Sequence, residues 1–126
     1  MSERNKATLK KANAAISAGD HEGFLVHCTE DTEWMFVGDQ TLKGKKAVRR
    51  WMKIAYAEPP RFKVARLIAG NDFVVALGEI MLKASDGKAA RHAYCDVWRF
   101  RGGKLAELKA FVVKVKAKAK RRSRSS

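Results

Sequence analysis

The chain has 126 residues, of which 46% are hydrophobic, and this is enough for one domain with a packed core. No apolar run approaches the roughly 18 residues that a membrane-spanning helix needs. The N-terminal segment, MSERNKATLKK, is too polar to be the apolar part of a secretory leader. We therefore expect a cytoplasmic protein that has no contact with a membrane.

The formal net charge of +14 is unevenly distributed along the chain. Residues 114–126, KVKAKAKRRSRSS, hold 7 Lys and Arg residues and no acid, which leaves a net charge of +7 for residues 1–113. We expect a domain over 1–113 and a basic, disordered tail over 114–126. The tail allows weak, non-specific contact with nucleic acid. Because it lacks aromatic residues for base stacking, a solvated tail is the simpler interpretation.

The first segments along the chain are helical. Residues 4–18 place Leu9, Ala12 and Ile16 at helical spacing, and Gly19 is a typical C-terminal cap.

A second, shorter helix is expected over 21–30, with Asp20 as its N-cap. The apolar side of this helix consists of Phe24, Leu25 and Cys28. A strand over 32–37 follows, since TEWMFV is rich in strand formers, and Gly38-Asp39 is a plausible turn.

The second half of the chain begins with a helix over 45–58, which Pro59-Pro60 ends. Short turns then separate four strand-like runs, so neighbouring strands must be antiparallel and form a meander. The runs are 62–69, 72–84, 88–101 and 104–115. This order predicts an α+β fold, in which three N-terminal helices pack on one face of a curved antiparallel sheet.

One strand, RHAYCDVWRF over 91–100, carries a carboxylate at its centre. Side chains alternate between the two faces of a strand, so Asp96 shares a face with the rings of the strand, while Arg91 and Arg99 share the other face. Because arginine is far easier to solvate than to bury, the ring side faces the helices. The ring side consists of His92, Tyr94, Asp96, Trp98 and Phe100. An inward carboxylate must be hydrogen-bonded, paired or protonated, which fits a ligand pocket or a structural partner equally well.

The segments AGD, LKGKKAVRRWM and DVWRFRGGKLAEL, with their order and spacing, resemble the nuclear-transport-factor-2-like superfamily over about residues 4–113. The likeness is strongest to its SnoaL-like and ketosteroid-isomerase-like branch. The resemblance implies a cone, a cystatin-like α+β barrel, in which a strongly curved sheet wraps around the helices and leaves an internal pocket. It also implies a homodimer formed through the sheets.

The resemblance implies a catalytic role for Asp96, which falls on the oxyanion-hole aspartic acid of the isomerase, a group that its apolar site keeps protonated. Counted without gaps from the shared Gly-Asp pair, the general-base Asp of the isomerase falls on Phe36 and its oxyanion-hole Tyr on Ala12. Neither residue can take up a proton. SnoaL-like cyclases use an Asp at the end of the last strand, and residues 110–113, AFVV, contain no acid. Whether the chain is an enzyme stays open.

The candidate site is a small-molecule pocket with Asp96 as acid or hydrogen-bond donor, assisted by Tyr94 or His92. For the hydrophobic wall, an ordinary core position is the competing interpretation of each residue. The wall residues are Trp34, Phe36, Trp51, Met52 and Trp98. We expect a small apolar organic ligand and isomerase-, cyclase- or hydrolase-like chemistry. The alternative is a non-catalytic ligand-binding or dimerisation domain whose basic tail contacts nucleic acid.

Metal and cofactor sites are not indicated. His27, Cys28, Glu30 and Asp31 are adjacent in sequence but lack the paired spacing of a zinc site. No serine lies in a glycine elbow, and no segment resembles a phosphate-binding loop. The two cysteines, Cys28 and Cys95, are expected to be unpaired, buried thiols.

Overall fold

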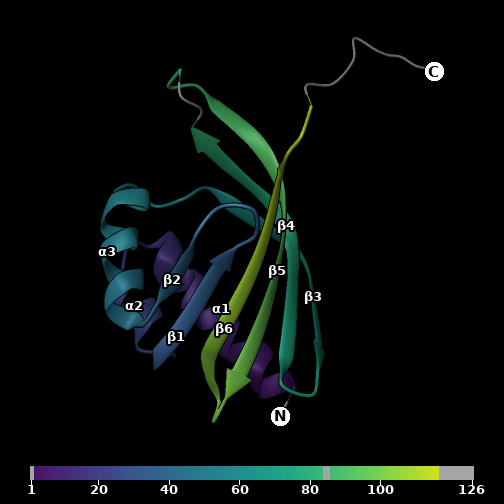
Figure 1. The fold of residues 1–126 in the computed structure, drawn as a ribbon. Helices are drawn as coiled ribbons and strands as arrows, with labels where there is room; N and C mark the ends of the chain where they lie inside the picture. The colour runs from purple at the N-terminus through teal and green to yellow at the C-terminus, as the bar shows by residue number, and fades with distance from the viewer. Residues whose placement is uncertain (1, 84–85, 117–126) are drawn as a thin grey trace, which may run out of the picture.

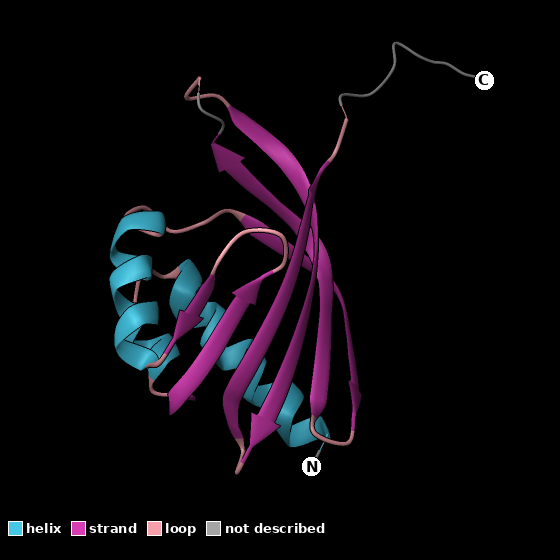
Figure 2. Cartoon of the chain, in the orientation of Figure 1, coloured by secondary structure: helices cyan, strands magenta, loops and turns pink. Residues whose placement is uncertain are grey.

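The computed structural model describes residues 2–83 and 86–116, and it has the α+β architecture that the sequence predicts (Figure 1). The helices lie together on one side of a curved sheet, and long strands form the other side (Figure 2). The helices are α1 (Ser2–Ser17), α2 (His21–Leu25) and α3 (Lys45–Ala55). The strands are β1 (Cys28–Phe36), β2 (Thr41–Lys43), β3 (Phe62–Gly70), β4 (Phe73–Lys83), β5 (Ala89–Arg101) and β6 (Lys104–Lys114).

The six strands form one sheet in the order β2-β1-β6-β5-β4-β3. The predicted meander of β3 to β6 is confirmed, since each of these strands pairs antiparallel with the next. The all-antiparallel expectation is wrong for one pair, because β1 runs parallel to β6. Strand β1 comes from the first half of the chain, so no tight turn dictates its direction relative to β6. The sheet is strongly curved but not closed, with β2 and β3 at its edges.

The second helix is shorter than predicted. Asp20 caps it as expected, by accepting a hydrogen bond from the backbone N–H of Gly23 at 2.9 Å. It ends at Leu25, and Cys28 already belongs to β1, where it is paired with Leu105. Sheet pairing with a strand almost 80 residues later therefore overrides the local helical pattern. The three-residue strand β2 was not predicted. The predicted basic tail lies outside the described residues from 117 onward.

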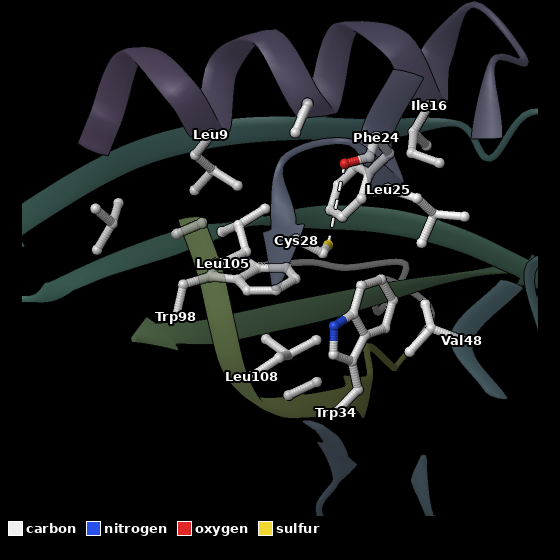
Figure 3. Packing of buried hydrophobic residues seen from close by; sticks show 14 of the residues in the cluster. Leu9, Ile16, Phe24, Leu25, Cys28, Trp34, Val48, Trp98, Leu105 and Leu108 are labelled. Atoms are coloured by element: carbon white, nitrogen blue, oxygen red, sulfur yellow. Dashed lines mark hydrogen bonds between the residues drawn. The ribbon is translucent and has the colours of Figure 1, made fainter. Parts of the chain in front are cut away.

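The core lies between the helices and the concave face of the sheet. The predicted stripe of α1 is confirmed, because Leu9, Ala12 and Ile16 are at most 4% exposed. The ring of Phe24 on α2 contacts the rings of Trp34 and Trp98, with centroids 5.6 and 5.9 Å away. Figure 3 shows this packing of helix and strand residues around the three rings. The contacts fix the helical layer at one end of the concave face.

Gly78 lies where β4 comes very close to the backbone of β3 and to the side chain of Tyr94. The two residues are paired across β4 and β5, and the register between β3 and β4 shifts between Val64 and Arg66. A Cβ atom at Gly78 would lie 2.2 Å from the carbonyl oxygen of Lys63 and 2.7 Å from the hydroxyl oxygen of Tyr94. Only glycine fits this close approach.

We expect Gly78→Ala to lower the free energy of unfolding by about 2–3 kcal/mol, because a backbone oxygen cannot move away as a flexible side chain can. Chemical denaturation of both proteins measures the difference. Gly70→Ala is the matched control: a Cβ there meets nothing within 4 Å, and the change should stay within about 0.5 kcal/mol. Equal effects of the two substitutions would contradict the close approach at Gly78.

Candidate functional site

A cavity of about 460 Å³ opens between the helices and the concave face of the sheet. This volume lies within the range of small-molecule pockets. Its wall combines residues from all three helices and from every strand except β2 with the turn after β1 and with Tyr56 and Pro60. Segments far apart in the sequence therefore meet at one hollow, as expected for a cone-shaped α+β fold.

Strand β5 places a carboxyl group in this cavity. Of the five side chains predicted to point inward, four line the wall and the fifth, Phe100, is buried in the core, so the predicted alternation is confirmed. In the sheet register, Asp96 is flanked by Ala76 on β4 and by Ala110 on β6. Methyl side chains on both sides leave empty volume around the carboxyl group. The inward residues that line the cavity are His92, Tyr94, Asp96 and Trp98.

The predicted wall residues also meet at the cavity. Trp34 and Phe36 come from β1, and Trp51 and Met52 come from α3. All eight site residues that the sequence predicts therefore line one hollow, and their roles there remain proposals. The competing interpretation, an ordinary core position, also holds in part, since Trp34, Met52 and Trp98 are at most 4% exposed.

Asp96 has no protein partner in the part of the chain that the structure describes, which shows neither a hydrogen bond nor an ion pair to its carboxyl group. Burial among apolar side chains raises the pKa of Asp96 from 3.8 to about 7. The arginines of the same strand point to the opposite face, and Arg99 there binds Glu107 at 2.8 and 3.0 Å. Near neutral pH the carboxyl group is therefore both a proton donor and a proton acceptor.

Two phenols accompany this carboxyl group. Burial, followed by the negative charge of Asp96, raises the pKa of Tyr94 to about 12. The same two causes, in the same order, raise the pKa of Tyr56 further. Both hydroxyl groups therefore stay protonated at physiological pH. Sequence reasoning missed Tyr56 as a site residue, although it caps the C-terminus of α3 four residues after Met52, at the spacing of one helical face.

The imidazole of His92 is held by its own strand. Its Nδ1 lies 2.9 Å from the carbonyl oxygen of Ala90, and because a carbonyl only accepts, Nδ1 donates in this contact. The other ring nitrogen, Nε2, has no hydrogen-bond partner among the described residues. Three residues of β5 lie between His92 and Asp96, and the described residues show no hydrogen bond between the two side chains. The two side chains line different depths of the cavity.

The aromatic wall is a connected set of rings. Trp51 contacts Phe36 and Tyr56 with ring centroids 4.9 Å away in each case, and it contacts Trp34 at 6.0 Å. Trp34 and Trp98 form a T-shaped pair at 5.3 Å. The indole N–H of Trp34 is buried and finds no hydrogen-bond acceptor among the described residues. In Figure 3 this nitrogen lies on the side of the ring nearer to Trp98, where a T-shaped neighbour can receive an N–H on its face.

The two positions on which isomerase groups would fall differ in environment. Phe36 lines the cavity as an apolar wall residue. Ala12 is fully buried in the helical core and does not reach the cavity. Neither supplies a proton-transferring group, and the titratable residues of the described lining are Asp39, Tyr56, His92, Tyr94 and Asp96.

Metal binding finds no support in residues 2–83 and 86–116, where no group of three or more His, Cys, Asp or Glu side chains could hold an ion. Cys28 is buried, and burial raises the pKa of its thiol to about 12, so it stays protonated. Cys95 is only partly buried, on the outer face, which corrects the prediction that both thiols are buried. Among the described helices, none is long and apolar enough to cross a membrane.

A sequence model of the SnoaL-like domain matches residues 9–108, which is most of the chain. The chain belongs to the SnoaL-like domain family. No curated protein matches the sequence. The fold of this SnoaL-like domain is shared by many solved structures.

Three solved structures illustrate the likeness. An NTF2-like protein of unknown function from Cytophaga hutchinsonii is 22% identical, with a TM-score of 0.71 over 85% of this chain and 97% of that chain. An LEH-like epoxide hydrolase of M. tuberculosis is 12% identical, with a TM-score of 0.77 over 88% and 84%. SalBIII, an epoxide hydrolase/cyclase-like enzyme, is 17% identical, with a TM-score of 0.78 over 87% and 91%. At these identities the likeness shows the fold alone.

The raised pKa of Asp96 makes the stability of this SnoaL-like domain depend on pH. Between pH 3.8 and about 7, the folded state keeps a proton that the unfolded state has lost. The stability from protonated Asp96 is therefore full below about pH 4 and is lost as the pH rises to about 7. We expect Asp96→Asn to remove this loss of stability with rising pH. The melting temperature of the variant should exceed that of the wild type by several degrees at about pH 8 and by less at about pH 5.

Differential scanning fluorimetry across pH measures this difference, and NMR titration of the Asp96 carboxyl carbon should give a midpoint near pH 7. Asp39→Asn is the matched control, because Asp39 lines the same cavity but is exposed. It should leave the pH dependence unchanged. An ordinary or lowered pKa for Asp96 would contradict the interpretation that its carboxyl group lies among apolar side chains without a partner.

Proposed function

We propose that this domain binds a small, largely apolar organic molecule in the cavity, with one polar group of the ligand against Asp96. The observation that carries the proposal is the unpaired carboxyl group in an aromatic hollow of about 460 Å³. A carboxyl group that faces an apolar hollow without a protein partner is costly, because it loses hydration and gains no hydrogen bond in return. A ligand oxygen that accepts a hydrogen bond from protonated Asp96 would supply the missing partner.

The chemistry that fits this site is proton transfer, of the isomerase, cyclase or hydrolase type. An acid is most effective when its pKa lies near the working pH, and the pKa of Asp96 is about 7. Tyr94 and Tyr56 remain protonated and can stabilise negative charge that develops on a ligand oxygen. The fold is shared with an epoxide hydrolase and with the epoxide hydrolase/cyclase-like SalBIII, which supports an enzyme of this general type.

A non-catalytic ligand-binding domain is the second candidate, and a specific observation favours it. Phe36 and Ala12 stand where the isomerase resemblance would place its general base and its oxyanion-hole tyrosine, and neither can transfer a proton. Under this alternative, Asp96 recognises the ligand but does not act on it. Asp96→Asn separates the two candidates, since it preserves a hydrogen-bond donor but abolishes proton transfer.

We expect Asp96→Asn to keep the affinity for a neutral aromatic ketone, such as naphthyl methyl ketone, within about threefold at pH 6. The amide has the size of the acid and still donates a hydrogen bond. Asp96→Ala should bind the ketone about tenfold more weakly, because it loses this hydrogen bond in a dry site. Isothermal titration calorimetry, or quenching of the cavity tryptophans, measures the affinities.

Asp39→Ala is the control for this series, since it removes an exposed carboxyl group of the same cavity and should not change ketone binding. If Asp96→Ala binds the ketone as tightly as the wild type does, Asp96 is not the recognition group.

A homodimer formed through the outer face of the sheet is also part of the proposal. Cys95 lies on this face between Leu77 and Phe111, and Val97 lies between Val75 and Lys109. Large apolar side chains on the same face are well exposed, among them Ile68 at 50% and Phe111 at 42%. An apolar surface of this kind is typical of a protein interface.

We expect sedimentation at tens of micromolar to give twice the chain mass, and Phe111→Glu to give the monomer, because it buries a charge at the centre of the proposed interface. Ile54→Glu is the matched control: Ile54 on α3 is 83% exposed and lies away from the sheet face. This variant should remain dimeric. A monomeric wild-type protein would reject the interface.

A further inference from the structure

The charge of this protein is strongly segregated from its cavity. Lysine and arginine make up 27 of the 126 residues, roughly one in five, yet none of the described residues that line the cavity is a lysine or arginine. The lining contains two carboxyl groups instead, Asp39 and Asp96. In a chain with a net charge of +14, the described lining of this cavity therefore includes acids but no lysine or arginine.

Three cations on the wall elements form ion pairs with acids that do not line the cavity. Arg49 on α3 binds Glu22 at 2.7 and 3.1 Å, and Lys45 binds Glu30 at 3.1 Å. Arg99 on β5 binds Glu107 on the outer face. A ligand carboxylate or phosphate would find no countercharge in the cavity and would face two acids. The wall thus disfavours anions.

The ring wall has the composition of a cation-binding site. Three tryptophans, with Phe36 and Tyr56, form a chain of contacts in which each ring is steeply inclined or tilted to the next. The rings of the wall therefore have several different orientations. A cation over the face of an aromatic ring is attracted by the ring quadrupole, and tryptophan is the strongest of these partners.

We propose that the cavity also binds hydrophobic organic cations, with the charge held between the aromatic rings and the Asp96 carboxylate. The inference rests on the proposed function, since it uses the same cavity. It adds a class of ligands that requires the opposite protonation state of Asp96. A neutral oxygen ligand needs protonated Asp96 as a donor. An organic cation needs ionised Asp96 as a countercharge, and it supplies the partner that the carboxylate lacks.

The two ligand classes should therefore depend on pH in opposite directions. Because burial places the pKa of Asp96 at about 7, its ionised fraction rises roughly 30-fold between about pH 5.5 and about pH 8.5. The other titratable groups that line the cavity are Asp39, Tyr56, His92 and Tyr94. Both tyrosines stay protonated in this interval. His92 and Asp39 must be tested by substitution.

Three probes with one ring system separate charge from shape: naphthyl methyl ketone, naphthylmethyl trimethylammonium and naphthoate. The ammonium ion is charged at every pH, so only the protein titrates. Isothermal titration calorimetry of the full chain should show that its affinity rises about 30-fold from pH 5.5 to pH 8.5. The affinity for the ketone should fall over the same interval, and naphthoate should bind most weakly throughout.

Four variants assign the effect. At pH 5.5, Asp96→Asn should bind the ketone like the wild type, and at every pH it should lose the affinity for the ammonium ion together with its pH dependence. Trp51→Leu should lower the affinity for the ammonium ion more than the affinity for the ketone, because it removes a ring face and keeps an apolar side chain. In His92→Gln and in Asp39→Asn, the affinity for the ammonium ion should still rise with pH. Circular dichroism confirms that each variant is folded.

Several results would overturn the inference: ammonium affinity that does not rise with pH, that survives Asp96→Asn, or that loses its pH dependence in His92→Gln or Asp39→Asn. Tighter binding of naphthoate than of the ammonium ion would overturn it as well. If the ketone binds and the ammonium ion does not, only the cation inference fails. If no probe binds, the proposed function fails with it.

Discussion

The site depends on one constraint, which is that the residues beside Asp96 in the sheet have small side chains. Ala76 and Ala110 flank the carboxyl group in the sheet, and Gly78 lies against the hydroxyl of Tyr94 two residue pairs further along. With larger residues at these positions, the concave face would pack directly against the helices, as protein interiors usually do. The small residues instead leave a hollow whose floor carries a carboxyl group.

The rings around this hollow decide the chemistry of the carboxyl group. Trp34, Trp51 and Trp98 exclude water without offering a hydrogen bond to the carboxylate, so the protonated form is favoured. This arrangement costs stability near neutral pH, where the unfolded chain ionises freely. A fold that keeps such a group without a partner is typical of a site that binds or transforms a ligand.

The two faces of β5 carry opposite properties, and the alternation of a strand separates them. The inner face brings Tyr94 and Asp96 to the cavity, while the outer face carries Arg91 and Arg99 with the apolar surface around Cys95. Because adjacent side chains point in opposite directions, strongly basic residues and an aromatic cavity coexist within ten residues. The lining of the cavity therefore contains no lysine or arginine among the described residues.

The sequence by itself determined what depends on neighbours along the chain. The helical spacing of Leu9, Ala12 and Ile16 and the inward face of β5 follow from fixed local periods, so both were predicted correctly. The helices and meander strands followed from local patterns and short turns in the same way. The eight site residues were predicted because large rings and a central carboxylate on one strand face stand out without any knowledge of their neighbours.

Only the tertiary structure decided which segments meet. The parallel pairing of β1 with β6, the early end of α2, the approach of Tyr56 to Asp96 and the two alanines beside the carboxyl group all depend on contacts between distant segments. No local period encodes such contacts, because they arise when separate elements bury their apolar faces against one another. The sequence therefore placed Asp96 on the inner face, and the packing of other elements around it left it without a partner.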